Sequence, residues 1–173
     1  MKRSNMQVSV ANDDITKLSV DAIVYPSNSQ GTMDEGLGLH IKTQGGEGIE
    51  EPPLASAPLA IGAAIVTTAG RLPAKKVIHV PTINRPGEFC TIENLRRAVR
   101  AALIASAVNK FSVIAVPGMG FNEEGVPHDE GARAVVEEIR AHKKEFPATI
   151  YLVDTDPEVL EAFEGAFENA LHG

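Results

Sequence analysis

The stretch FSVIAVPGMGFNEEGVPHDEGARAVVEEIR, residues 111–140, contains a strand, a glycine-rich loop and a helix in succession. Residues 111–117 form a nearly unbroken apolar run, which is typical of a central strand covered on both faces. Four apolar residues then recur at helical spacing and predict a helix over about residues 128–142. They are Ala132, Val135, Val136 and Ile139. A strand, a glycine loop and a helix in this order are typical of a phosphate-binding site.

The flanking sequence repeats this alternation of strands and helices. Thr91 and Asp156 are suited to cap two of the helices, because their side-chain oxygens can accept an orphan backbone N–H. The glycine- and proline-rich segment 44–58 is expected to be a surface connection. Strands are predicted at 7–11, 21–26, 62–70, 75–81 and 148–154, and helices at 37–43, 92–109 and from 157 onward. The alternation predicts a three-layer α/β/α fold with a mixed, largely parallel central sheet, in a single domain over residues 1–173.

Composition excludes several classes of function. The formal net charge of -7 argues against broad attraction to nucleic acid or to an anionic membrane, and no stretch is long and apolar enough to span a bilayer. Cys90 is the single cysteine, so no internal disulfide can form. No apolar segment of signal-peptide length follows the basic residues near the start. We therefore expect a cytoplasmic protein with no nucleic-acid partner, no membrane partner and no cofactor.

Three loops are placed to form a ligand site. In open α/β sheets, ligands bind beyond the carboxyl ends of the strands, where strand-to-helix loops gather. The loops at residues 12–17, 27–38 and 118–127 all follow predicted strands.

Three segments resemble the macrodomain family, in order and with matching spacing from about residue 7 to residue 165. PLAIGAAIVTTAGRLPAKKVIHVP, residues 58–81, resembles the family's central run, A-x-V-T-x-A-G-x-L-P-A-K-x-V-I-H. NDDITKLSVDAIVYPSN, residues 12–28, is similar to its opening, G-D-I-T-x-L-x-V-D-A-I-V-N-A-A-N. Residues 115–127 have the position and length of its second phosphate loop. The resemblance implies a cleft for ADP-ribose or its derivatives, which some members of the family hydrolyse.

The resemblance assigns ligand contacts to the opening segment. Asp14 matches an aspartate that accepts a hydrogen bond from the adenine amino group, with Ile15 beside it. An ionised carboxylate suits this role because it only accepts. Without the resemblance, Asp14 is a turn residue or a helix cap. Asn28 matches an asparagine on the distal ribose side, and its alternative is an asparagine that ends a strand. Tyr25 replaces the first asparagine of the same motif.

The first phosphate loop departs from the family pattern. The family has three glycines and an apolar residue, whereas this chain has Asp-Glu-Gly-Leu at 34–37, so Gly36 and Leu37 are the matching residues. Glycine lets backbone N–H groups approach a diphosphate without a Cβ in the way. Gly38 stands where the hydrolytic branch has an aspartate that helps to activate water. The resemblance therefore implies that this chemistry has lost its acid or base.

The second phosphate loop keeps part of its pattern. Gly120 and Gly125 match, while Asn122 replaces the middle glycine. Phe121 either covers the distal ribose or caps the core. Glu124 falls near a catalytic acid of a different branch, the terminal ADP-ribose glycohydrolase type, but no matching lysine accompanies it.

Four acidic residues on the two loops leave four interpretations open. In the first, their side chains point to solvent while the backbone binds phosphate. In the second, ADP-ribose binding has been lost or retuned. Alternatively, the carboxylates gather a divalent cation such as Mg²⁺ or Ca²⁺, or one of them catalyses hydrolysis. The four residues are Asp34, Glu35, Glu123 and Glu124.

We predict that the protein is a binding module for ADP-ribose or a related nucleotide. An ADP-ribosylated protein is the other partner that we consider. The alternatives are an ADP-ribosyl hydrolase, including ADP-ribose phosphate processing, and a scaffold that has lost ADP-ribose binding. No catalytic residue and no metal site is predicted. His79 is expected to be structural and His128 to face solvent, while His40 would meet a phosphate if it faced the cleft. Cys90 has no paired histidine at a spacing that indicates a thiol nucleophile.

Overall fold

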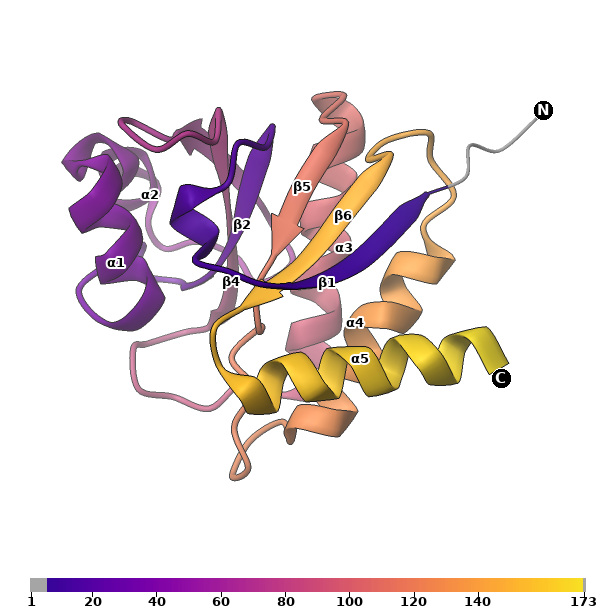
Figure 1. The fold of residues 1–173 in the computed structure, drawn as a ribbon. Coiled ribbons are helices and arrows are strands. Elements are labelled where there is room, and N and C mark those ends of the chain that lie inside the picture. The colour runs from indigo at the N-terminus through magenta and orange to yellow at the C-terminus, as the bar shows by residue number, and fades with distance from the viewer. Residues whose placement is uncertain (1–5, 173) are drawn as a thin grey trace.

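The computed structural model describes residues 6–172, with side chains through residue 168. Its six strands form one sheet in the order β1-β6-β5-β2-β4-β3 (Figure 1). The strands are β1 (Gln7–Asn12), β2 (Ala22–Asn28), β3 (Ile65–Thr68), β4 (Lys76–Ile83), β5 (Val113–Val116) and β6 (Thr149–Asp154). Of these strands, only β3 is antiparallel to its neighbour, β4, and the other neighbouring pairs are parallel. The predicted mixed, largely parallel sheet is confirmed.

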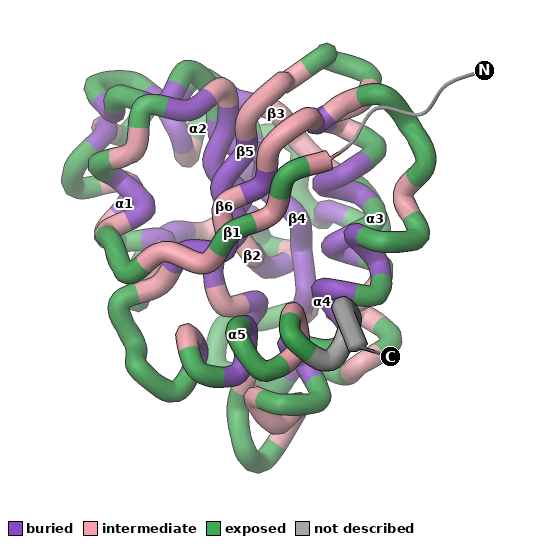
Figure 2. Tube along the Cα trace, turned by 45° about the vertical axis from the view of Figure 1, so that its right-hand side comes forward, coloured by how far each residue is buried: buried purple, intermediate pink, exposed green. Residues whose placement is uncertain are grey.

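Helices cover both faces of the sheet. They are α1 (Gly36–Gly45), α2 (Glu51–Ser56), α3 (Ile92–Val108), α4 (His128–Ala141) and α5 (Pro157–His172), with 3-10 helices η1 (Ile15–Lys17) and η2 (Glu47–Ile49). Successive residues of β2 point to opposite faces, as strand geometry requires. Ala22 and Val24 pack in a core with α3, α4 and α5, whereas Ile23 and Tyr25 pack in a second core with α1, η1 and η2. Figure 2 shows the buried residues concentrated along the strands and the inner sides of the helices.

The predicted helix caps are present. The Thr91 hydroxyl accepts from the backbone N–H of Asn94 at 3.2 Å, and α3 begins at the next residue after Thr91. The Asp156 carboxylate accepts from the N–H of Glu158 at 3.0 Å at the start of α5. Both side chains satisfy donors that the first helical turn leaves without a partner.

The segment 44–58 is more structured than predicted. It is mostly exposed, as expected of a surface connection, but it also contains η2 and α2. Proline is tolerated in the first turn of a helix because the N–H it lacks would have no intrahelical partner there. Pro53 lies in that turn and is buried, as is Ile49 of η2. Burial of these two side chains therefore decides the local structure. Among the described residues, no helix combines the length and apolarity needed to cross a bilayer.

Candidate functional site

A cavity of about 390 Å³ lies where the carboxyl ends of three parallel strands meet. Asn28 ends β2, Ile83 ends β4, and Gly118 follows β5. This is the position predicted from the sheet topology. The cavity is lined by Tyr25, Pro26, Ser27, Asn28, Thr32, Asp34, Glu35, Leu37, Gly38, Ile83, Pro86, Gly118 and Gly120.

The structure gathers only part of the predicted ligand-binding set around this cavity. Asn28, Leu37 and Gly120 line it. The other predicted residues lie outside its lining, and they are Asp14, Ile15, Gly36, Phe121, Asn122 and Gly125. Gly36 is directly adjacent in the chain to the lining residues Glu35 and Leu37, so the first loop as a whole reaches the cavity.

The amino end of α1 opens into the cavity. Glu35 is the N-cap residue, and its side chain makes no capping hydrogen bond. The N–H groups of the first helical turn have no partner within the helix. Leu37 and Gly38, which belong to that turn, line the cavity. Because the helix dipole also places partial positive charge here, this end of α1 is suited to an anion.

Lys42 balances the aspartate of the first loop. Its ammonium lies 3.0 Å from Asp34 and 3.1 Å from Glu50. Hydrogen bonds with Asp34 and with Glu50 raise the pKa of Lys42 above its usual value. The second Glu50 oxygen accepts from the backbone N–H of Met33 at 2.7 Å and so holds the loop. The charge of Asp34 is therefore partly offset, and Glu35 is the loop's remaining exposed acid.

The second glycine loop uses many of its own amides. The N–H of Asn122 donates to the Val126 carbonyl at 2.8 Å, and the N–H of Gly125 donates to the Asn122 carbonyl at 2.9 Å. The Asn122 side chain also accepts from the N–H of Glu124 at 2.8 Å. Gly120 has a φ of 77°, in the left-handed region that favours glycine. Among the described residues, the N–H of Gly120 has no acceptor, so it remains available to a ligand.

Asp14 caps the 3-10 helix η1, as the alternative interpretation of that residue predicts. Its Oδ1 accepts from the backbone N–H and the hydroxyl of Thr16, at 2.9 and 2.7 Å. His40 does not line the cavity, and its Nε2 lies 2.9 Å from Asp14 Oδ2 instead. Burial opposes ionisation of Asp14, but hydrogen bonds from Thr16 and His40 outweigh it and hold the pKa below its usual value. Oδ2 keeps capacity for one more donor.

Asn28 lines the cavity, but its amide is already engaged. Its nitrogen donates to the carbonyl and the hydroxyl of Thr32 at 3.1 and 3.2 Å. Its oxygen accepts from the backbone N–H of Gln30 at 3.0 Å. The side chain therefore shapes the turn after β2. A ribose contact would require one of these bonds to be exchanged.

The side chain of Tyr25 occupies the space beside Gly38. Tyr25 is buried, lines the cavity and donates a long hydrogen bond of 3.4 Å to the Thr32 carbonyl. A Cβ added at Gly38 would lie 2.8 Å from Tyr25 Cζ and would also overlap its hydroxyl. Burial, and then the charges of Glu50, Asp34 and Glu35, raise the pKa of Tyr25 to about 12. The phenol thus stays protonated and fills the space beside Gly38.

The other histidines and the cysteine have structural surroundings. His79 is fully buried, its Nε2 lies 2.9 Å from the Thr67 hydroxyl, and burial lowers its pKa to about 4. Its Nδ1 has no partner among the described residues, so the expected structural group is only partly satisfied. Burial raises the pKa of Cys90 to about 11, although a hydrogen bond with Leu95 opposes this. A thiol with that pKa is a poor nucleophile.

His128 does not face solvent as predicted. Only 17% of its side chain is exposed, because its ring packs edge-on against Phe121 with centroids 6.0 Å apart. Phe121 in turn contacts Phe163 at 5.7 Å, as its core-capping alternative predicts. Glu123 pairs with His128 at 2.9 Å. Glu123 and Asp34 therefore have different basic partners, His128 and Lys42.

Sequence reasoning missed several residues that line the cavity. Ile83 is the last residue of β4, Pro86 follows that strand, and Thr32 comes from the turn after β2. The signal available was topological: β4 lies beside β2 and runs parallel to it. Residues that follow the carboxyl end of β4 must therefore reach the same edge of the sheet as the first loop.

Comparison with known proteins identifies the family. The Macro domain family model matches residues 24–135. An uncharacterized protein of Aquifex aeolicus is 43% identical over 92% of this chain and 96% of that protein. A Salmonella gallinarum protein named O-acetyl-ADP-ribose deacetylase is 31% identical over 91% of this chain and 92% of its own. The solved Oceanobacillus iheyensis macrodomain with ADP has a TM-score of 0.84 at 21% identity, over 99% of this chain and 95% of that chain. This chain belongs to the Macro domain family.

Proposed function

We propose that the cavity binds ADP-ribose or a closely related nucleotide, with its phosphates on the amino end of α1. The observation that carries the proposal is the first turn of α1, which has no side-chain cap and borders a 390 Å³ cavity at Leu37 and Gly38. Unpaired N–H groups and the helix dipole favour a phosphate there. Gly120 supplies a further unpaired N–H from the opposite loop.

The family relatives support this ligand class. The Oceanobacillus iheyensis structure contains ADP, and the Salmonella relative is named for O-acetyl-ADP-ribose. In this proposal the adenine extends beyond the cavity lining to Asp14, whose Oδ2 accepts from His40 and has room for one further donor, such as an adenine amino group.

The acidic residues weaken binding without abolishing it. The ammonium of Lys42 offsets the charge of Asp34, and His128 pairs with Glu123. Among the described residues, Glu35 lines the cavity and forms no ion pair. A like-charge contact at about 4 Å costs roughly 1 kcal/mol in water. Glu35 therefore reduces the affinity for a diphosphate by about fivefold or more in our proposal.

Isothermal titration of the full chain with ADP-ribose tests the proposal. Adenosine, which lacks phosphate, is expected to bind more weakly than ADP-ribose. Glu35→Gln should raise the affinity for ADP-ribose about fivefold, because it removes the like charge. Glu47→Gln is the matched control, since Glu47 is exposed on η2 and lies outside the cavity lining. Absence of heat at millimolar ADP-ribose with both the wild type and Glu35→Gln would leave the scaffold alternative.

Binding is favoured over hydrolysis. The name of the Salmonella relative supports a hydrolytic alternative. In this chain, however, Gly38 carries no acid or base, and the Tyr25 ring fills the space that a side chain there would take. We therefore expect no release of product when the chain is incubated with O-acetyl-ADP-ribose and analysed by chromatography. If product is released, and Tyr25→Phe releases it as fast as the wild type, other residues of the site must carry the reaction.

A further inference from the structure

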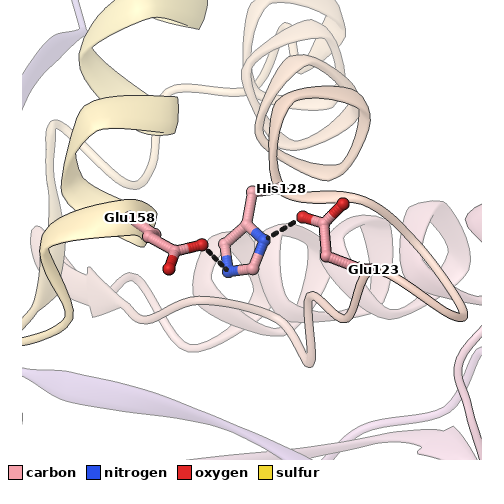
Figure 3. Close-up of side chains that lie close together, drawn as sticks. All are labelled: Glu123, His128 and Glu158. Carbon is pink, nitrogen blue, oxygen red and sulfur yellow. Dashed lines mark hydrogen bonds and ion pairs between the residues drawn. The ribbon is translucent and has the colours of Figure 1, made fainter.

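Three side chains from separate segments meet beside the second glycine loop. Glu123 comes from the loop, His128 is the first residue of α4, and Glu158 lies in the first turn of α5 (Figure 3). His128 Nδ1 is 2.9 Å from Glu123 Oε1, and His128 Nε2 is 4.0 Å from Glu158 Oε2. One potential ligand atom from each residue lies within 4.8 Å of the others.

The imidazole of His128 is held in a fixed orientation. Its ring is largely buried against Phe121, which packs on Phe163. An ionised carboxylate only accepts hydrogen bonds, so the short contact with Glu123 assigns the donated N–H to Nδ1. In the neutral ring, Nε2 then carries the lone pair and faces Glu158. A carboxylate on the far nitrogen is the usual partner of a metal-bound histidine.

The space between Nε2 and Glu158 is suited to an ion. Their separation of 4.0 Å is too long for a hydrogen bond. Two ligands at about 2.0–2.2 Å from one tetrahedral ion lie roughly 3.4 Å apart, so a small movement closes the difference. The Glu158 side chain is 74% exposed and free to make that movement. A cavity of about 260 Å³ adjoins it and is also lined by the carboxylates Asp129 and Glu161.

We propose that His128 Nε2 and Glu158 bind a divalent first-row transition-metal ion such as Zn²⁺, while Glu123 orients the imidazole from Nδ1. Imidazole favours these ions over Mg²⁺ and Ca²⁺, which prefer oxygen ligands. Asp129 and Glu161 line the same cavity, and solvent would fill the remaining coordination positions. This site shares no lining residue with the proposed nucleotide cavity, so either proposal can fail without the other.

Isothermal titration of the full chain with ZnCl₂, and in parallel with MgCl₂, tests the site. One saturable Zn²⁺ event is expected, with Mg²⁺ binding at least tenfold more weakly. His128→Gln and Glu158→Gln should each abolish this event, and Glu123→Ala should weaken it about 10- to 100-fold. Two controls should retain it: Glu164→Gln removes another exposed acid of α5, and His142→Gln removes a distant imidazole.

Circular dichroism in the presence of EDTA establishes that each variant is folded before titration. Glu158→Gln keeps the proposal testable if His128→Gln does not fold, because Glu158 is exposed. Three results would overturn the proposal: no Zn²⁺ binding by the wild type, unchanged affinity in a folded His128→Gln or Glu158→Gln variant, or equal affinities for Mg²⁺ and Zn²⁺.

Discussion

Introducing a side chain at Gly38 tests the packing of the site directly. In Gly38→Ala, the new Cβ would lie 2.8 Å from Tyr25 Cζ and 3.2 Å from Met33 Cα. Carbon atoms pack best at about 3.5–4.0 Å, so the phenol ring or α1 must move. Overpacking of this kind costs about 1–3 kcal/mol. Replacing glycine by alanine inside a helix returns about 0.5–1 kcal/mol, so we expect a net loss of unfolding free energy between about 0 and 2.5 kcal/mol, or about 1 kcal/mol at the middle of the two ranges.

A double-mutant cycle assigns that loss to the tyrosine. Tyr25→Leu removes Cζ and the hydroxyl while keeping an apolar side chain in the core. In that background Gly38→Ala should be close to neutral, which gives a coupling energy of about 1 kcal/mol between the two positions. Gly165→Ala is the matched control, because Gly165 also lies in a helix but has no atom within 4 Å of an added Cβ. It should stabilise the chain by about 0.5–1 kcal/mol.

Urea unfolding followed by far-ultraviolet circular dichroism measures all five proteins under one condition. The reasoning is refuted if Gly38→Ala is as benign as Gly165→Ala, or if its cost is the same with Tyr25 and with Leu at position 25. A confirmed coupling would mean that an acid cannot be introduced at position 38 without also changing Tyr25.

Three further outcomes are expected. Alkylation of Cys90 by iodoacetamide at pH 8 should be at least about tenfold slower in the native chain than in urea, because burial raises the pKa of the thiol to about 11. Equal rates would show that the thiol is not protected by burial. Glu138→Gln should cost about 1 kcal/mol in urea titrations, because it weakens hydrogen bonds from Arg96 and Arg100 that hold α3 against α4; an unchanged midpoint would show that solvent screens these pairs. The stability that the wild type has over Asp14→Asn should be complete above the unfolded pKa of 3.8 and should shrink as pH falls through the lower folded pKa. Urea midpoints at several pH values measure this difference, and a difference that does not change with pH would contradict the lowered pKa of Asp14.

The fold could be predicted from the sequence because its signals are local. The apolar run at 111–117 and the Thr91 cap each specify an element by a few neighbouring residues. The short helices η2 and α2 within segment 44–58 were not predicted, because its glycines and prolines indicate a loop unless the burial of Ile49 and Pro53 is known. Burial of that kind is set by the rest of the fold.

The site was less predictable, because its residues interact across long separations. The position of the cavity followed from the strand order, and Asn28, Leu37 and Gly120 of the predicted binding set line it. No sequence pattern indicates that the Tyr25 ring fills the space beside Gly38. No pattern indicates either that His128 faces Glu158, which lies on another helix. Such contacts depend on side-chain directions that spacing does not encode.

Lys42 makes the anion affinity of the first loop sensitive to a residue outside it. With the amine protonated, the group formed by Asp34, Lys42 and Glu50 carries one net negative charge. Acetylation of Lys42 would remove the positive charge and free Asp34 to face an incoming phosphate. Under the proposed function, modification of this one lysine on α1 would lower the affinity of the cavity for a nucleotide, although Lys42 is not among the residues that line it.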